Sequence, residues 1–247
     1  MRLDKFLSST GRLTRSAAGK AIRGGQVSVN GERVRTPDLH IDPDTDEITL
    51  GGEVLTYRRY TYILLNKPDG YVSATEDGND PTVLTLLPEE LQRQNLFPCG
   101  RLDKHTLGLM LLTNHGPLAH RLLAPRTHVE KTYVFTLRDP ISPEEVARLE
   151  RGVQLLDGAG DTYLSQPCRI TLDADGQSGS IVLTEGKYHQ IKRLFEAADN
   201  KVLTLERTRF DTLTLEDLPQ RGQWRYLTPE EEKTLLAHLH PSQSQSE

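Results

Sequence analysis

The segment from Gly100 to Thr113 constrains the fold more than any other part of the chain. In residues 106–113, both sets of alternating side chains are apolar or small. A strand without a charged face is buried on both sides, so we expect it inside a sheet. Asp103 comes just before this strand, at the edge of the expected core. A carboxylate there needs a cation or a hydrogen-bond donor beside it, because an unpaired buried charge is costly.

Arg101 stands two residues before Asp103 and could supply that positive charge. In an arbitrary sequence, an Arg-x-Asp pair is more often structural than catalytic, because structural ion pairs also surround carboxylates. The motifs that accompany this pair favour a catalytic carboxylate instead.

Four motifs resemble those of the pseudouridine synthases, in the same order and with similar spacing. They are Asn66-Lys67-Pro68, Gly100-Arg101-Leu102-Asp103, Glu130-Lys131-Thr132-Tyr133 and His189-Gln190-Ile191-Lys192. The resemblance covers nearly the whole chain and is greatest to the RsuA family, which forms pseudouridine at position 516 of 16S ribosomal RNA. It implies an isomerase that depends on an aspartate, matched here by Asp103.

The resemblance also implies roles for residues around Asp103. Lys192 matches the basic residue that pairs with the aspartate, and Tyr133 matches a tyrosine that can stack on uracil. Arg101 matches a position that helps to evert the target nucleotide; neutralising Asp103 is an equally good role for it. Asp103 itself could attack the sugar, attack the base or remove the proton at C2′, and the sequence leaves all three open.

Residues 1–50 are predicted to form a small RNA-binding domain of α/β type. Helical spacing marks a first helix, Thr14 can cap a second one, and Asn30-Gly31 suits a tight hairpin turn. This arrangement resembles the S4 domain. The cations expected to contact RNA are Arg2, Lys5, Arg12, Arg15, Lys20 and Arg23 here, with Lys67, Arg126, Lys187, His189 and Arg193 around the active site.

The rest of the chain is predicted to be a linker at 51–59, a catalytic domain at 60–240 and a disordered tail at 241–247. We expect strands at 60–66, 131–137, 180–184 and 203–209, and helices at 117–123 and 187–198. Interleaved strands and helices with short links indicate an α+β fold. The resemblance adds a mixed, mainly antiparallel sheet flanked by helices.

Composition narrows the class of protein. No apolar run approaches the roughly 20 residues that span a bilayer, and the two cysteines are too few for a disulfide framework, so we expect a cytoplasmic protein without membrane contact. No phosphate-loop or dinucleotide motif and no metal-ligand spacing is present, so no cofactor is expected. The net charge of −5 argues weakly against RNA binding, although residues 1–35 hold eight Arg or Lys against two acidic residues.

Two other functions remain open. Relatives with the same N-terminal module modify 23S ribosomal RNA, and a non-catalytic ribosome-binding protein could also be built on an S4 domain. The expected partner is ribosomal RNA or an assembling small-subunit particle, and we expect a monomer.

Overall fold

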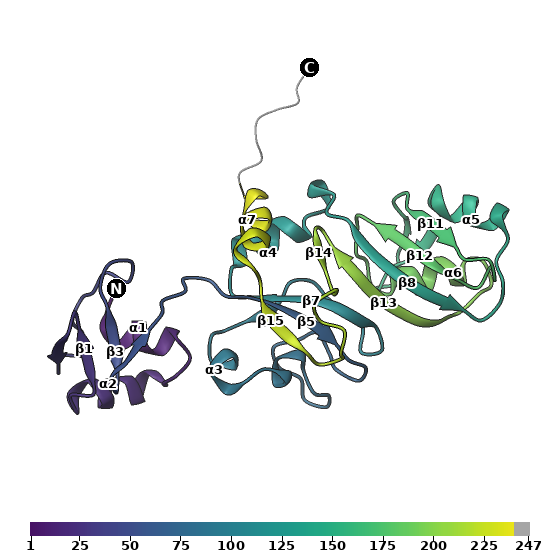
Figure 1. Cartoon of the computed structure of the whole chain (residues 1–247). Helices are drawn as coiled ribbons and strands as arrows, with labels where there is room; N and C mark the ends of the chain where they lie inside the picture. The colour runs from purple at the N-terminus through teal and green to yellow at the C-terminus, as the bar shows by residue number, and fades with distance from the viewer. Residues whose placement is uncertain (240–247) are drawn as a thin grey trace, which may run out of the picture. The chain divides into compact units, whose positions relative to one another are not determined.

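The structure is a computed structural model that describes residues 1–239, and it divides into two compact units (Figure 1). The first unit comprises Met1–Thr61 and Leu84–Phe97; the second comprises Tyr62–Val83 and the chain from Pro98 onward. Two short elements, η1 (Val83–Leu86) and β6 (Phe97–Pro98), lie where the chain passes between units. The predicted disordered tail, 241–247, lies outside the described residues.

The first unit is a four-stranded antiparallel sheet with helices. Its elements are α1 (Leu3–Ser9), α2 (Arg15–Arg23), β1 (Val27–Val29), β2 (Glu32–Val34), β3 (Ile48–Leu50), β4 (Glu53–Leu55) and α3 (Glu89–Gln92). The strand order is β2-β1-β3-β4. Thr14 caps α2 as predicted, because its side chain accepts a hydrogen bond from the Ala17 amide. The buried core includes Phe6, Ile22 and Ile48.

The linker prediction was wrong for its first half. Residues 53–55 form β4, which pairs in register with β3. Gly51 and Gly52 both have positive φ, so they form the turn between these two strands rather than the start of a linker. The first unit therefore extends beyond residue 50.

The second unit is built on one large mixed sheet. Its helical elements are α4 (Gly116–Leu123), η2 (Pro125–Thr127), α5 (Pro143–Glu150), α6 (Gln190–Glu196) and α7 (Pro229–Ala237). Its strands are β5 (Tyr62–Lys67), β7 (Leu107–Thr113), β8 (Lys131–Leu137), β9 (Gln154–Leu156), β10 (Thr162–Leu164), β11 (Arg169–Leu172), β12 (Ser178–Leu183), β13 (Val202–Phe210), β14 (Leu213–Thr214) and β15 (Trp224–Tyr226).

The main sheet runs β11-β12-β8-β13-β7-β5-β15, with β14 beside β13, while β9 and β10 form a separate hairpin. Only the β13–β7 pair on this path is parallel. The expected mixed, mainly antiparallel sheet is therefore confirmed. Strand β7 lies inside the main sheet. Leu109 to Leu112 are completely buried, as we predicted from the two apolar faces of this strand.

The helix predicted at 187–198 begins three residues later than expected. His189 has a φ of +52°, in the left-handed region, so the chain turns there and α6 starts at Gln190. Tyr188, inside the predicted range, lies outside the observed helix and is 50% exposed. The described residues contain no helix that is long and apolar enough to cross a bilayer.

Gly108 allows β7 and β13 to approach each other closely. Its φ is +99°, and parallel pairing places it opposite Arg207. A Cβ at this position would lie 2.2 Å from the carbonyl oxygen of Arg207. Only glycine therefore fits here without movement of the two strands that border the pocket described below.

We predict that Gly108→Ala lowers the free energy of unfolding by roughly 2 kcal/mol or more, because it adds a backbone clash to an unfavourable φ. Urea denaturation measures this loss. Gly31→Ala is the matched control, since Gly31 also has positive φ but has no neighbour within 4 Å of the added carbon. Equal losses in the two variants would contradict the close-approach account.

Candidate active site

Asp103 lies in a loop that several side chains hold in place. Ser73 hydrogen-bonds both the carbonyl and the amide of Leu102, at 2.7 Å and 3.0 Å. The amide of Thr106 donates to the carbonyl of Asp103 at 3.0 Å. The carboxylate therefore has a defined position just before β7, as the sequence predicted.

The carboxylate of Asp103 is paired with two basic side chains from the β12–α6 region. Lys192 Nζ lies 2.7 Å from Oδ2, and His189 Nε2 lies 3.4 Å from Oδ1. The side chains of Asp103 and Lys192 are 27% and 29% exposed, so the pair borders solvent without being fully hydrated. The predicted pairing of Lys192 with Asp103 is confirmed.

Helix α6 positions Lys192 because its other face is anchored in the core. Ile191, Leu194 and Phe195 are buried, and the Phe195 ring packs against Phe135 of β8 with centroids 4.7 Å apart. At the start of the helix, Gln190 accepts a hydrogen bond from the Lys187 amide. The ammonium group is thus carried on a rigid element.

A pocket of about 440 Å³ opens beside the ion pair. Its lining combines the Asp103 loop, β8, the loop before α6 and β13, and includes Arg101, Asp103, Thr106, Leu123, Lys131, Tyr133, Tyr188, His189, Lys192, Leu205 and Arg207. A volume of this size suits a small organic ligand. Tyr133, from β8, is 8% exposed and lines the pocket, so the structure brings the predicted catalytic residues together.

Arg101 also lines the pocket, but it is exposed and forms no ion pair with Asp103 among the described residues. Lys192 and His189 take the pairing role instead. Of the two roles considered for Arg101, the pairing with Asp103 was therefore wrong.

Lys67 does not have the surface position expected of an RNA-binding lysine. It is completely buried, and its ammonium group donates to the carbonyl oxygens of Pro68, Lys104 and Thr106 at 2.9–3.1 Å. Lys67 ends a strand that is buried along its whole length. Lys67 thus fastens the segment that follows Asp103 to β5.

Among the pocket residues that were not predicted from the sequence are three polar ones, Thr106, Lys131 and Arg207. Lys131 is 6% exposed and donates to the carbonyl oxygens of Val129 and Thr184. Burial lowers the pKa of Lys131 to about 8, and the positive charge of Arg207 acts in the same direction. The alternation of side chains along a strand could have identified two of these residues, because Lys131 shares its strand face with Tyr133 and Arg207 stands in a predicted strand.

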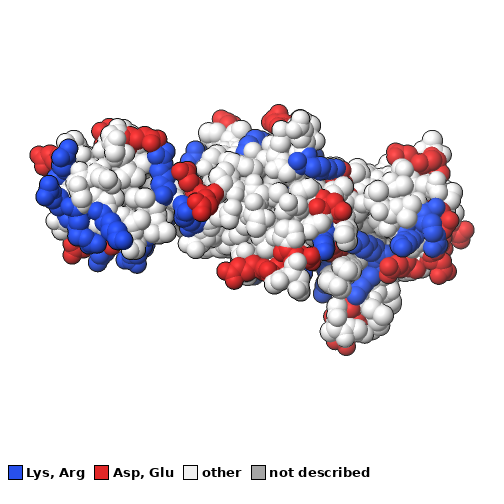
Figure 2. Space-filling view, turned by 90° about the horizontal axis from the view of Figure 1, so that it is seen from below, with Lys and Arg blue, Asp and Glu red and all other residues white. Residues whose placement is uncertain are grey.

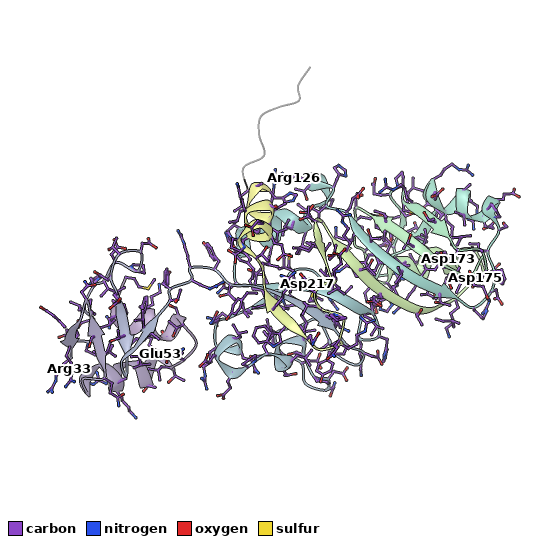
Figure 3. All side chains as sticks on the ribbon, in the orientation of Figure 1. Arg33, Glu53, Arg126, Asp173, Asp175 and Asp217 are labelled. Carbon is purple, nitrogen blue, oxygen red and sulfur yellow. The ribbon has the colours of Figure 1, made fainter. Side chains whose placement is uncertain are left out.

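Of the basic residues expected around the active site, Lys187 and Arg193 lie beside aromatic rings, whereas Arg126 lies outside the pocket lining. Lys187 lies 5.0 Å from the Tyr163 ring, and Arg193 lies 5.1 Å from the Tyr188 ring. Tyr188 stacks on His189 with centroids 3.9 Å apart, so this side of the pocket carries both cations and aromatic rings. Arg126 is exposed in η2 and is not part of the pocket lining (Figure 3).

The first unit displays basic side chains over one face, with acidic ones near its margin (Figure 2). Lys5, Arg15, Lys20 and Arg23 are all exposed. Arg2 pairs with Asp4 at 2.8 Å and Arg12 forms a two-pronged pair with Glu53, whereas Arg15 makes only a longer contact of 3.8 Å with Asp4. The surface best suited to phosphate is therefore the exposed group on α1 and α2.

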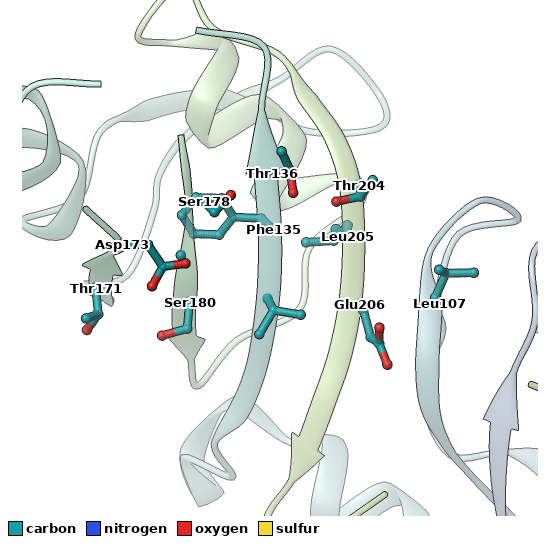
Figure 4. A pocket seen from close by; sticks show the side chains of 12 residues that line it. Leu107, Phe135, Thr136, Thr171, Asp173, Ser178, Ser180, Thr204, Leu205 and Glu206 are labelled. Atoms are coloured by element: carbon teal, nitrogen blue, oxygen red, sulfur yellow. The ribbon is translucent and has the colours of Figure 1, made fainter. Parts of the chain in front are cut away.

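A second cavity, of about 350 Å³, lies on the opposite face of the main sheet (Figure 4). It is lined by hydroxyl, carboxylate and apolar groups, including Thr136, Asp173 and Glu206, and by no lysine or arginine. Along β7 and β13, Leu107 and Glu206 face this cavity while Thr106 and Arg207 face the pocket at Asp103. The two cavities are thus separated by the thickness of one sheet.

Comparison with known proteins agrees with this geometry. A family model described as RNA pseudouridylate synthase matches residues 61–197, and an S4 domain model matches residues 1–48. A solved structure titled "Crystal structure of pseudouridylate synthase" aligns with a TM-score of 0.66 and 37% identity, covering 95% of this chain and 99% of that one. The chain belongs to the RNA pseudouridylate synthase family.

Relatives of known name share nearly its whole length. The chain is 41% identical to the uncharacterized RNA pseudouridine synthase YtzG of Bacillus subtilis, over 94% of this chain and 96% of the relative. It is 38% identical to ribosomal small subunit pseudouridine synthase A of Escherichia coli K12, over 94% of this chain and 98% of the relative. The resemblance drawn from the motifs is confirmed, as is the combination of an S4 domain with a pseudouridine synthase domain.

Lys67 gives the stability of this site a pH dependence. Burial lowers the pKa of Lys67 to about 8, from 10.5 in the unfolded chain. Between these values the unfolded chain binds more protons, so the contribution of Lys67 to stability rises with pH. We predict that the free energy of unfolding of wild type, minus that of Lys67→Met, increases on the order of 1 kcal/mol from about pH 7.5 to 9.5 in urea titrations. A constant or falling difference would contradict this account.

Proposed function

We propose that this protein converts a uridine of 16S ribosomal RNA, at position 516, into pseudouridine, with Asp103 as the essential catalytic group. The observation that carries the proposal is the Asp103–Lys192 ion pair, 2.7 Å long, at the mouth of a pocket that also holds Tyr133. The names of the small-subunit relatives favour 16S over 23S RNA as the substrate. The presence of all three residues favours an enzyme over a non-catalytic binding protein.

The reaction is an isomerisation and balances without a co-reactant. The bond from N1 of uracil to C1′ of ribose breaks, a bond from C5 to C1′ forms, and the proton on C5 is lost while N1 gains one. Asp103 acts by attacking the sugar, attacking the base or removing the C2′ proton; each needs a charged carboxylate that can reach the nucleotide. Lys192 places an ammonium group 2.7 Å from that carboxylate.

The surrounding side chains serve binding and positioning. Because the carboxylate is only partly exposed at the pocket, the target uridine has to leave its stack to reach it. Arg101, exposed and without an acidic partner among the described residues, is placed to occupy the vacated space in the RNA. The ring of Tyr133 supplies a face for the uracil to stack on.

The substrate assignment predicts a site-specific loss of modification. In a strain lacking the gene, pseudouridine should disappear from one position of 16S RNA and from none of 23S RNA. Wild-type protein should restore the site, whereas Asp103→Asn should reduce turnover by more than about 1,000-fold and fail to restore it, because the amide carries no charge. Sequencing for pseudouridine in both RNAs measures these outcomes.

Asp69→Asn is the matched control for loss of a carboxylate. Asp69 is exposed and pairs with His105 at 2.9 Å, away from the pocket lining. It should restore the 16S site fully. Loss of a 23S site in the deletion strain would identify 23S RNA as the substrate. Unchanged pseudouridine maps of both RNAs would favour the non-catalytic binding protein.

The exposed cations of the first unit predict a salt-dependent contribution to RNA affinity. Replacing Arg15, Lys20 and Arg23 with alanine should weaken binding and reduce the slope of log K against log salt by roughly 2–3, if each meets one phosphate. Filter-binding titrations at several salt concentrations measure the slope. Arg12→Ala is the control and should change it less, because Glu53 already neutralises that guanidinium. An unchanged slope in the triple variant would contradict the contact between these three cations and RNA phosphates.

A further inference from the structure

Two polar side chains on the floor of the pocket have no part in the chemistry described above. Thr106 and Arg207 are each 2% exposed, and both line the pocket at Asp103. The hydroxyl of Thr106 has no hydrogen-bond partner in the described part of the chain. A buried polar atom without a partner is unusual in folded proteins, so its position in a substrate pocket indicates a contact that forms with the ligand.

The guanidinium of Arg207 is also incompletely satisfied. Its Nε donates to the carbonyl oxygen of Leu109 at 2.7 Å, and a second nitrogen lies 3.9 Å from the sulfur of Met110, which is a weak acceptor. No carboxylate within residues 1–239 forms an ion pair with it. Because a guanidinium has five N–H donors, several have no hydrogen-bond partner in the described part of the chain, and the Phe210 ring lies 5.2 Å from the group.

Strand pairing brings these two groups together beside Tyr133. Arg207 stands opposite Gly108 on β7 and opposite Tyr133 on β8. Thr106 lies two residues before Gly108, and its backbone is held by Lys67 and by Asp103. The residues that alternate with this pair, Leu107 and Glu206, face the second cavity instead (Figure 4).

Uracil presents a matching set of groups on one edge: the N3–H donor, flanked by the carbonyl oxygens O2 and O4. We propose that Thr106 and Arg207 form a reading site for this edge, in which the Thr106 hydroxyl accepts from N3–H and the Arg207 guanidinium donates to O4 of the bound uridine. The inference rests on the proposed function, because it assigns the base recognised at that same pocket.

The geometry of the reaction explains why this edge suits recognition. To present C5 in place of N1, the detached uracil turns by half a revolution about the axis through N3 and C6. That turn exchanges O2 with O4 and leaves N3–H where it was. Contacts to N3–H and to one flanking carbonyl position are therefore the same before and after the turn, so the reading site can hold the base throughout.

The same contacts discriminate between pyrimidines. Cytosine carries an amino group in place of O4 and has no hydrogen on N3. A guanidinium can only donate, so it has no favourable contact with that amino group. A buried donor left unpaired disfavours the wrong base strongly.

Thr106→Val tests the contact with N3–H. The substitution preserves shape and removes a hydroxyl that has no partner, so thermal stability should be unchanged or higher, while kcat/KM for pseudouridine formation on a 16S fragment falls about tenfold. Thr113→Val, in the strand that follows Thr106, is the control: its hydroxyl accepts from the His115 amide at 3.1 Å, outside the pocket lining. It should lower stability and leave kcat/KM unchanged.

Arg207→Gln tests the contact with the carbonyl. The measurement uses an Asp103→Asn background, in which bound uridine is not converted. Dissociation constants are measured for two RNAs that carry uridine or cytidine at the target position. Their ratio does not depend on the fraction of protein that is folded. The preference for uridine should be about tenfold or more before the substitution and approach unity after it.

The outcomes separate the two proposals. If the wild-type protein forms no pseudouridine on this RNA, the proposed function fails. If it does, and Thr106→Val retains kcat/KM within about twofold while Arg207→Gln keeps the preference for uridine, the reading site is overturned.

Discussion

The ion pair between Asp103 and Lys192 is the contact on which the rest of the site depends. It joins a loop and a helix that are 89 residues apart in the chain. Each partner is anchored by other contacts: Lys67 and Ser73 hydrogen-bond the loop, and the buried face of α6 packs the helix in the core. The pocket exists because these two anchored elements meet at the sheet, and a charged carboxylate is kept at its mouth.

The sheet does more than support this pair, because its two faces carry different chemistry. One face gives the pocket its cations, its tyrosine and an unpaired hydroxyl; the other face forms a cavity lined without lysine or arginine. The overall charge of −5 is thus compatible with an RNA substrate, since positive charge is concentrated at the pocket and on the exposed helices of the first unit.

Much of this arrangement could be predicted from sequence where the signal is local. The doubly apolar strand and the Thr14 cap were correctly expected from local patterns, and the Asp103–Lys192 pairing was correctly expected from the resemblance to the pseudouridine synthases. Short strands such as β4 and β15 were missed, because three residues show too little alternation to identify. The role of Lys67 was missed because burial of a lysine depends on carbonyl groups brought together by folding. Thr106 and Arg207 were missed because the burial of their polar groups also follows from folding and not from local sequence.

The most direct test is the distance between the side chain of residue 103 and C1′ of the target uridine, in a crystal structure of Asp103→Asn bound to a 16S RNA fragment. The account predicts an everted uridine whose ring lies against Tyr133 and whose C1′ is in van der Waals contact with residue 103. A uridine still stacked in the RNA, or bound away from this pocket, would contradict it.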